Sequence, residues 1–294
     1  MLAGLLAFLS GCRLDAPPPR SGEKTTAEFR DPRLVTVEGW EKDLMEPFIS
    51  RDGKWLFFNN SNSPFVNTDL FYAERIDDLR FRFKGAVKGA NTRFLDAVAS
   101  MDESGRFYMT TTRDYERGLQ TIFSGDFQDG VLTKLRVTPG NFAHLKPGWV
   151  TMDVEISADG NTFYYSDAFF TKGAVPKSSH LGVAVRDAKG AFLVPANAAE
   201  LLKNVNSKDD LEYAPASSRD GLELFFTRLT MKGLHFRVMR ARRKSLGEPF
   251  GEPEVVSAVA GGLVEAPTLA PDGKTLYYHK KDGSKHRLYR VVRD

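Results

Sequence analysis

One pattern occurs five times along this 294-residue chain, and it constrains the fold more than any other feature. Each copy has an acidic residue, a short apolar segment, a turn that contains aspartate and a second apolar segment. The turn aspartates, which are 50 to 61 residues apart, are Asp52, Asp102, Asp159, Asp220 and Asp272. A period of this length suits a repeated unit of four β-strands.

The apolar segments indicate how the units pack. Trp55–Phe58 and Leu224–Phe226 are apolar at every position, so these second strands must be covered on both faces. Asp-Gly before them favours a two-residue hairpin turn, except at Asp102–Gly105, where the loop is longer. In the fourth segment charged residues alternate with large apolar residues, as in Arg80–Lys84, which is typical of a solvent-exposed edge strand of a sheet. Sheets stacked face to face around an axis satisfy all of this, and we predict an all-β, five-bladed β-propeller of four-stranded antiparallel blades.

The two ends of the repeat region indicate how the ring closes. The last unit stops at Asp294, directly after its third strand, and so lacks a fourth. Arg33–Val37 is a spare β-branched segment before the first unit. We therefore expect it to pair with Arg287–Val292, which places the propeller at residues 33–294. The only helical period is short, at Ala196–Val205.

The turn of the last unit resembles a known repeat. Ala270-Pro271-Asp272-Gly273-Lys274 is similar to the Ser-Pro-Asp-Gly-Lys turn of the WD40-like (PD40) repeat of TolB-type proteins. The resemblance extends from Leu34 to the C-terminus, with five copies of the motif. It implies the same β-propeller fold.

The first 32 residues have a different character. Met1–Leu9 is an apolar run too short to span a bilayer, which needs about 20 residues. Leu9-Ser10-Gly11-Cys12 resembles the lipobox of bacterial lipoproteins, although no basic residue precedes the run. The resemblance implies a signal region over 1–12 and lipidation of Cys12, the only cysteine; the alternative is a buried N-terminal segment. Residues 13–32, which include Pro17-Pro18-Pro19, predict a disordered tether. We expect a monomer on the periplasmic side of a bacterial envelope, with the lipid anchor as its only membrane contact.

Charge and motif content exclude several functions. The net charge of +3, without a basic block, gives no footprint for nucleic acid. The five histidines are scattered, unlike the ligands of a zinc site. No phosphate-binding loop or nucleophile elbow occurs. We therefore predict no metal and no cofactor.

An acidic residue begins every unit, at the face where the innermost strands of a propeller start. These residues are Glu46, Asp96, Asp153, Glu212 and Glu265. Carboxylates that converge on one axis can form a binding site for a cation or a polyol, with shifted pKa values. The other interpretation is structural, because each acid can accept hydrogen bonds from backbone N–H groups at the start of its blade.

A catalytic alternative comes from five-bladed glycosidases of the arabinanase type. Glu265-Ala266-Pro267 looks like the acid-bearing turn of those enzymes, and Met45-Glu46-Pro47 resembles their base-bearing turn, though in a different blade order. The resemblance implies a hydrolase that uses Glu46, Asp96 and Glu265. Ser157–Phe163 is similar to the sialidase Asp-box, which is structural.

The loops between second and third strands differ in length and carry aromatic residues. Arg113 and Tyr115 lie in one loop, Phe169 and Phe170 in another, and Phe65 in a third. Such loops carry function more often than scaffold, although Phe169 and Phe170 can also fold inward to cap the channel. We therefore expect a non-enzymatic recognition platform for an envelope protein, peptide or glycan, with glycan hydrolysis as the alternative.

Overall fold

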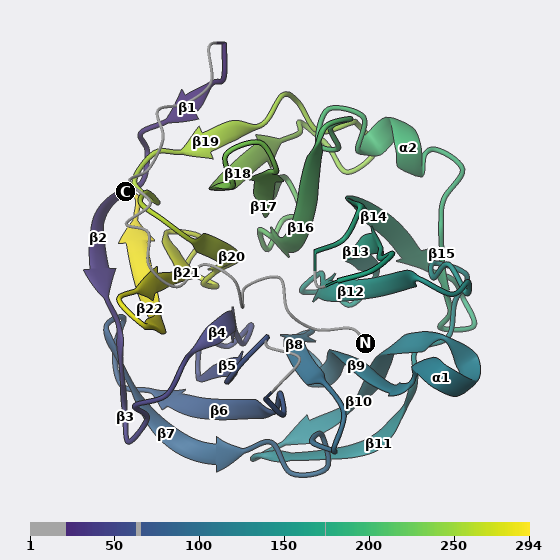
Figure 1. The fold of residues 1–294 in the computed structure, drawn as a ribbon, viewed down its shortest axis with the longest axis horizontal. Coiled ribbons are helices and arrows are strands. Elements are labelled where there is room, and N and C mark those ends of the chain that lie inside the picture. The colour runs from purple at the N-terminus through teal and green to yellow at the C-terminus, as the bar shows by residue number, and fades with distance from the viewer. Residues whose placement is uncertain (1–21, 63–65, 174) are drawn as a thin grey trace.

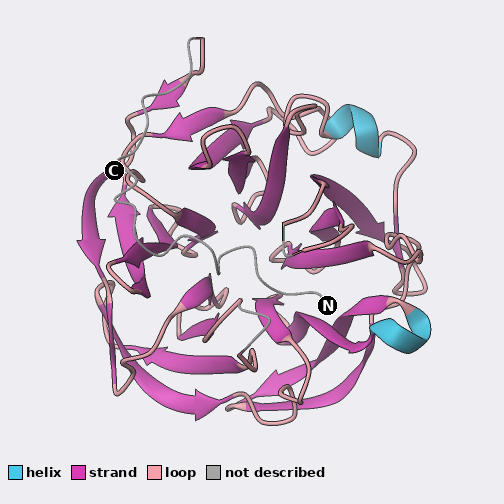
Figure 2. Ribbon diagram, in the orientation of Figure 1, coloured by secondary structure: helices cyan, strands magenta, loops and turns pink. Residues whose placement is uncertain are grey.

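Five small sheets surround a central axis in the computed structural model, which describes residues 22–62, 66–173 and 175–294 (Figure 1). The predicted five-bladed β-propeller is confirmed. In each sheet four strands follow one another from the axis outward with antiparallel pairing. Strands make up most of the described chain, and two one-turn helices lie at the outside of the ring (Figure 2).

The blades take their strands largely in chain order. Blade one contains β4 (Met45–Ile49), β5 (Trp55–Asn59), β6 (Leu70–Arg75) and β7 (Arg80–Ala86). Blade two contains β8 (Asp96–Met101), β9 (Arg106–Asp114), β10 (Gln120–Gln128) and β11 (Val131–Val137). Blade three contains β12 (Trp149–Ile156), β13 (Thr162–Phe169), β14 (Ser178–Arg186) and β15 (Phe192–Leu193). Blade four contains β16 (Asp210–Ser217), β17 (Glu223–Thr230), β18 (His235–Arg242) and β19 (Glu254–Val256). Blade five contains β20 (Val264–Leu269), β21 (Thr275–Asp282) and β22 (Lys285–Val292), with β2 (Arg30–Leu34) as its fourth strand.

The second strand of each blade is buried on both faces, as predicted. In β5, Phe57 packs into a cluster that includes Phe107 of blade two. Its neighbour Phe58 points to the other face and packs in a cluster with Tyr277 of blade five. Because side chains alternate along a strand, one apolar strand thus joins two neighbouring blades. This packing between blades is what holds the ring together.

The turns after the first strands are longer than the predicted two-residue hairpins. In blade one, β4 ends at Ile49 and β5 begins at Trp55. Within this loop Asp52 Oδ1 accepts a hydrogen bond from the backbone N–H of Lys54 at 3.0 Å, and Gly53 adopts a φ of 73°. The aspartate therefore shapes the turn through its side chain, and glycine supplies the left-handed backbone.

The N-terminal strand closes the ring on the last blade, as predicted. Strand β2 pairs antiparallel with β22, with Arg33 opposite Arg290 and Leu34 opposite Tyr289. The chain then continues as β3 (Thr36–Glu38), which runs parallel to β7 of blade one. The predicted single strand Arg33–Val37 is therefore divided between two blades, because its first part pairs with blade five and its last part with blade one. Val35 and Val37 are both buried.

The predicted disordered tether over residues 13–32 is wrong for its last part. Strand β1 (Thr25–Thr26) pairs in parallel with β19 of blade four. Phe29 is only 2% exposed and packs edge-on against Phe225, with ring centroids 5.8 Å apart. Glu28 forms an ion pair at 2.7 Å with the buried Arg240. One aromatic side chain and one counter-charge are enough to attach a polar segment to the propeller.

The remaining N-terminal predictions lie outside the described residues. These are the signal region 1–12 with Cys12, and the part of the tether before residue 22. The predicted helix at Ala196–Val205 is present as the shorter α2 (Ala198–Leu201), and α1 (Tyr115–Gly118) follows β9. Within the described ranges, no helix has the length and apolar character that a membrane span requires.

Candidate functional site

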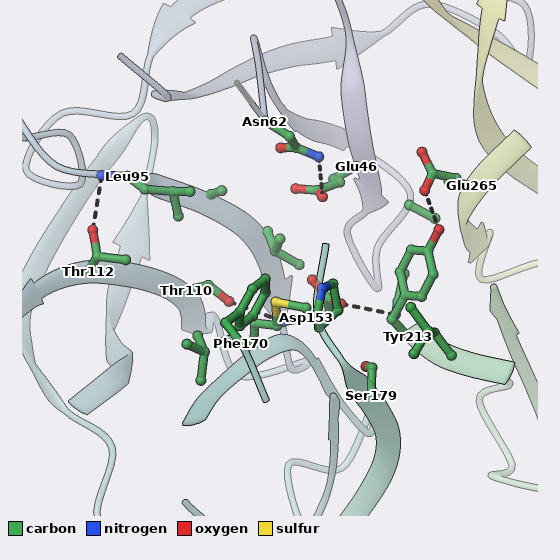
Figure 3. Close-up of a pocket in the computed structure, with 18 of the residues that line it drawn as sticks. Glu46, Asn62, Leu95, Thr110, Thr112, Asp153, Phe170, Ser179, Tyr213 and Glu265 are labelled. Carbon is green, nitrogen blue, oxygen red and sulfur yellow. Dashed lines mark hydrogen bonds between the residues drawn. The ribbon is translucent and has the colours of Figure 1, made fainter. Parts of the chain in front are cut away.

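A pocket of about 110 Å³ occupies the central channel, at the face where the innermost strands begin (Figure 3). Every blade contributes to its lining. Most of the lining residues are apolar, among them Leu95, Val150, Met152, Phe170 and Leu211. The acidic residues among them are Glu46, Asp153 and Glu265. The pocket is therefore an apolar cavity that contains three carboxyl groups from three different blades.

The five blade acids look equivalent in the sequence repeat, but the structure separates them. Each innermost strand has a β-bulge, where one residue adopts a left-handed φ of 49° to 53°. These bulge residues are Glu46, Val98, Asp153, Ala214 and Ala266. An acid at the bulge or one residue before it reaches the pocket, whereas an acid two residues before it does not, because the bulge interrupts the regular alternation of side chains along the strand. This is why only three of the five acids reach the pocket.

Asp96 and Glu212 lie two residues before their bulges and form ion pairs within their own blades. Asp96 is fully buried, with Arg113 Nη2 2.6 Å from its Oδ1. Glu212 is also fully buried, with Arg228 Nε 2.9 Å from its Oε1. Neither acid lines the pocket. Each ion pair joins the first two strands of its own blade, Asp96 with Arg113 in blade two and Glu212 with Arg228 in blade four.

Glu46 is the least satisfied of the pocket acids. Its Oε1 accepts a hydrogen bond from Asn62 Nδ2 at 2.7 Å. Its Oε2 is buried and has no hydrogen-bond partner among the described residues. Burial, with the negative charges of Asp153 and Glu265, raises the pKa of Glu46 to about 8. Glu46 is therefore mostly protonated at neutral pH.

Asp153 occupies the equivalent bulge two blades away. It is 6% exposed, and its Oδ2 accepts a hydrogen bond from the backbone N–H of Ala214 at 3.2 Å. Burial raises the pKa of Asp153 to about 6, and the negative charge of Glu265 adds to this. At neutral pH the two bulge acids thus differ in protonation, because Asp153 is mostly ionised and Glu46 is not.

Glu265 has hydrogen-bond donors on both oxygens, and Figure 3 shows the one from Tyr213. The hydroxyl of Tyr213 donates to Oε1. The backbone N–H of Glu46 donates to Nδ1 of His279 at 3.0 Å, so this nitrogen carries no proton. His279 Nε2 then carries the proton and donates to Glu265 Oε2 at 3.3 Å. Burial also lowers the pKa of His279, which keeps its imidazole neutral.

The channel is closed below the pocket. It narrows to a cavity of about 20 Å³ whose lining includes Glu155. Arg51 Nη2 lies 2.7 Å from Glu155 Oε1, and the hydroxyl groups of Ser100 and Ser217 donate to the same carboxylate, each at 3.0 Å. An ion pair and two hydroxyl donors thus occupy the channel below the pocket.

The predicted aromatic residues lie near one side of the pocket. Phe170 lines it, whereas Phe169 packs against Trp149 with ring centroids 5.2 Å apart. His144 lies on Trp149, with ring centroids 4.5 Å apart. The Tyr115 hydroxyl accepts from the backbone N–H of Gly148 and donates to the carbonyl of Trp149, so it joins blades two and three.

Several residues of the site were not predicted from the sequence. Tyr213 and His279 support Glu265, Asn62 bonds to Glu46, and His144 and Trp149 extend the aromatic cluster. Apart from the position of Tyr213 beside an acid, nothing in the repeat distinguishes these residues. Phe65, also singled out in the sequence, lies outside the described residues.

Comparison with known proteins supports the fold and does not assign a family. No protein-family model matches the chain, and no curated protein does. A solved structure titled "Glycoside hydrolase" is similar, with a TM-score of 0.57, 11% identity and coverage of 92% of each chain. The endo-arabinase of Bacteroides thetaiotaomicron gives a TM-score of 0.53 at 14% identity, over 89% of this chain and 96% of that one. TolB of Acinetobacter baumannii gives 0.48 at 12% identity, over 86% of this chain, which spans 55% of the TolB chain.

Proposed function

We propose that this chain is a recognition propeller of the bacterial cell envelope that binds a protein, peptide or glycan at its central pocket. The pocket carries this proposal, because apolar side chains from blades two to five converge there around buried carboxyl groups. Apolar concave sites with a few convergent polar groups are the usual form of a binding site. Phe170, with Phe169 and Trp149 beside it, adds aromatic surface at one side.

The size of the pocket favours binding of a small group over cleavage of a chain. An apolar cavity of about 150 Å³ takes one benzene molecule. At about 110 Å³, this pocket accepts the head group of a ligand whose remainder lies on the open face. A glycosidase needs room for a sugar ring and for two carboxyl groups on either side of the bond that breaks.

A pull-down with the purified propeller tests the proposal. We expect an envelope component to co-purify with the wild-type chain and to be lost with Phe170→Ala, while the melting temperature stays unchanged. Leu246→Ala is the matched control, because Leu246 is 59% exposed and does not line the pocket. Equal capture by all three proteins would exclude the pocket as the binding site.

The proposed location depends on Cys12, which we infer is lipidated. Expression in a bacterium with radiolabelled palmitate tests this. We expect label and membrane fractionation with the wild-type chain, and neither with Cys12→Ser. Label in the variant, or wild-type protein in the soluble fraction, would contradict the anchor.

A second candidate, hydrolysis of a glycan, is favoured by the different protonation of Glu46 and Asp153. One carboxylic acid and one carboxylate in a single site are what acid–base cleavage of a glycosidic bond requires. Asp153 then replaces Asp96 in the predicted catalytic set, because Asp96 is paired with Arg113. Activity on arabinan, xylan or sialoglycans that disappears in Asp153→Asn and Glu265→Gln would favour this candidate over non-enzymatic recognition.

A further inference from the structure

The pocket lacks a positive charge. Three other acids buried in the first strands, Asp96, Glu155 and Glu212, each have an arginine partner. By contrast, no lysine or arginine is found among the residues that line the pocket in the described part of the chain. Its one histidine, His279, is held neutral by the hydrogen bond to its Nδ1. The lining therefore supplies no cationic side chain to the pocket acids.

One oxygen atom in the pocket has a vacant bonding position. Glu46 Oε2 is buried and receives no hydrogen bond from the described residues, while its Oε1 is bonded to Asn62 (Figure 3). A buried polar atom without a partner is costly, because it has lost its hydrogen bonds to water and gained none in their place. Such an atom in the wall of a cavity marks a place where a ligand donor improves the energy.

We propose that the pocket binds the primary ammonium group of an organic amine with a short apolar substituent, such as the N-terminus of a peptide that begins with an aliphatic residue. This names the ligand class for the proposed recognition function and rests on it. The ammonium nitrogen has three N–H donors and a positive charge. Glu46 Oε2 and the carboxylate of Asp153 are its acceptors.

A bare metal ion fits the pocket less well than an organic cation. In the described ranges, no group of three or more His, Cys, Asp and Glu residues is arranged to hold a metal. The walls instead offer Leu95, Val150 and Met152, which gain from contact with an alkyl group, and Phe170, whose ring face attracts cations. The volume of about 110 Å³ limits the occupant to the ammonium group and a short substituent.

Binding of an ammonium group must be coupled to release of a proton. Glu46, whose pKa is about 8 in the empty pocket, is mostly protonated at pH 7. A positive charge beside it favours the ionised carboxylate, so the carboxyl group loses its proton as the amine binds. Affinity is therefore expected to increase from pH 6 to pH 8.5, below the pH at which an alkylamine of pKa about 10 loses its own charge.

Calorimetric titration with 3-methylbutylamine, and with 3-methyl-1-butanol as its uncharged isostere, tests the proposal. At pH 7.5 we expect the amine to bind at least tenfold more tightly than the alcohol. Titrations in phosphate and in HEPES, which contain no primary amine and whose ionisation enthalpies differ, should reveal release of a fraction of one proton. Glu46→Gln should weaken amine binding at least tenfold and abolish the proton release, and Asp153→Asn should also weaken it. Glu116→Gln, an exposed acid on α1, serves as control and should change neither quantity.

The outcomes separate this inference from the proposed function. Equal affinity for amine and alcohol, absence of amine binding, or unchanged binding by Glu46→Gln would overturn the ammonium proposal. Capture of an envelope component that depends on Phe170 but is not displaced by the amine would also overturn it, and would leave pocket recognition intact. Melting curves recorded for each variant exclude unfolding as the cause of a lost signal.

Discussion

Replacing Glu46 by glutamine should make the protein more stable at high pH. In the unfolded chain a glutamate ionises near pH 4.5, whereas in the folded pocket the pKa of Glu46 is about 8. Between these values the folded state holds one proton more than the unfolded state. The free energy of unfolding therefore falls as pH increases through this window. Glutamine has nearly the same shape and no charge, so the variant lacks this decrease.

The size of the effect follows from the two pKa values. The pKa of Glu46 is 4.5 in the unfolded chain and about 8 in the folded protein. This difference lowers the free energy of unfolding by about 4 kcal/mol between pH 5 and pH 8.5. This is an upper limit, because water that enters the pocket lessens the desolvation of the carboxylate. Asp153, with a pKa raised to about 6, adds a decrease that is largely complete near pH 6 and that persists in the variant.

Urea denaturation at half-unit steps from pH 5 to pH 8.5, followed by tryptophan fluorescence and circular dichroism, measures this. We expect the wild-type and Glu46→Gln curves to diverge steadily toward high pH, with the variant the more stable. Glu116→Gln should follow the wild type, because its carboxyl group is exposed. Parallel pH profiles for wild type and Glu46→Gln would refute the assignment of an elevated pKa to this residue.

Three further predictions concern the scaffold. Phe29→Ala should cost about 3 to 5 kcal/mol in urea unfolding, because a buried ring is lost from the N-terminal segment; a cost below about 1 kcal/mol would mean that this segment does not hold the ring. Arg51→Met should destabilise the fold by about 3 to 5 kcal/mol, since it leaves Glu155 buried without its cation, and Glu155→Gln in the same chain should restore much of the loss. The pKa of Glu28 is lowered to about 2, first by its hydrogen bond to Arg240, so wild-type stability should fall as pH decreases from 4.5 toward 2. Glu28→Gln should flatten that decrease in the urea midpoint, and identical acid limbs would contradict the ion pair.

The fold was predictable because its signals are local and repeated. An aspartate that accepts backbone N–H groups and a glycine with positive φ shape a turn wherever they occur, as at Asp52 and Gly53. A strand such as Trp55–Asn59, apolar at nearly every position, can be buried only between two layers. Five copies of these signals leave little choice of architecture. The missing fourth strand of the last unit likewise indicated how the ring closes.

The N-terminal attachment was not predictable for the same reason. Phe29 is one aromatic residue in a polar segment and belongs to no period. Its burial depends on a gap beside Phe225, and that of Glu28 on the charge of Arg240, both more than 190 residues away in sequence. Contacts of this kind depend on the three-dimensional structure of the folded propeller. The sequence of the segment alone therefore predicts disorder.

The site was predicted in composition but not in arrangement. The repeat placed an acid at the start of each blade, but the amino-acid sequence of the repeat does not show where the β-bulge lies. An acid that stands two residues before the bulge faces an arginine of its own blade, as Asp96 and Glu212 do, whereas Glu46, at the bulge itself, faces the pocket. The five acids thus occupy three different positions relative to the bulge, and each position has its own environment. Recurrence of an acid in every blade therefore does not by itself indicate a structural role.

The stability of the scaffold and the chemistry of the pocket are linked through Glu46. An arginine beside Glu46, placed as Arg113 is placed beside Asp96, would remove the pH-dependent loss of stability. It would also occupy the position that a ligand cation can take. The chain instead has Asn62 there, a neutral donor that bonds one carboxyl oxygen, and the other oxygen has no hydrogen-bond partner in the part of the chain that the structure describes. A ligand that binds only the folded state returns stability in proportion to its affinity. An ammonium ligand should therefore raise the melting temperature of the wild type most at pH 8.5, where the empty pocket is least stable, and should leave Glu46→Gln almost unchanged.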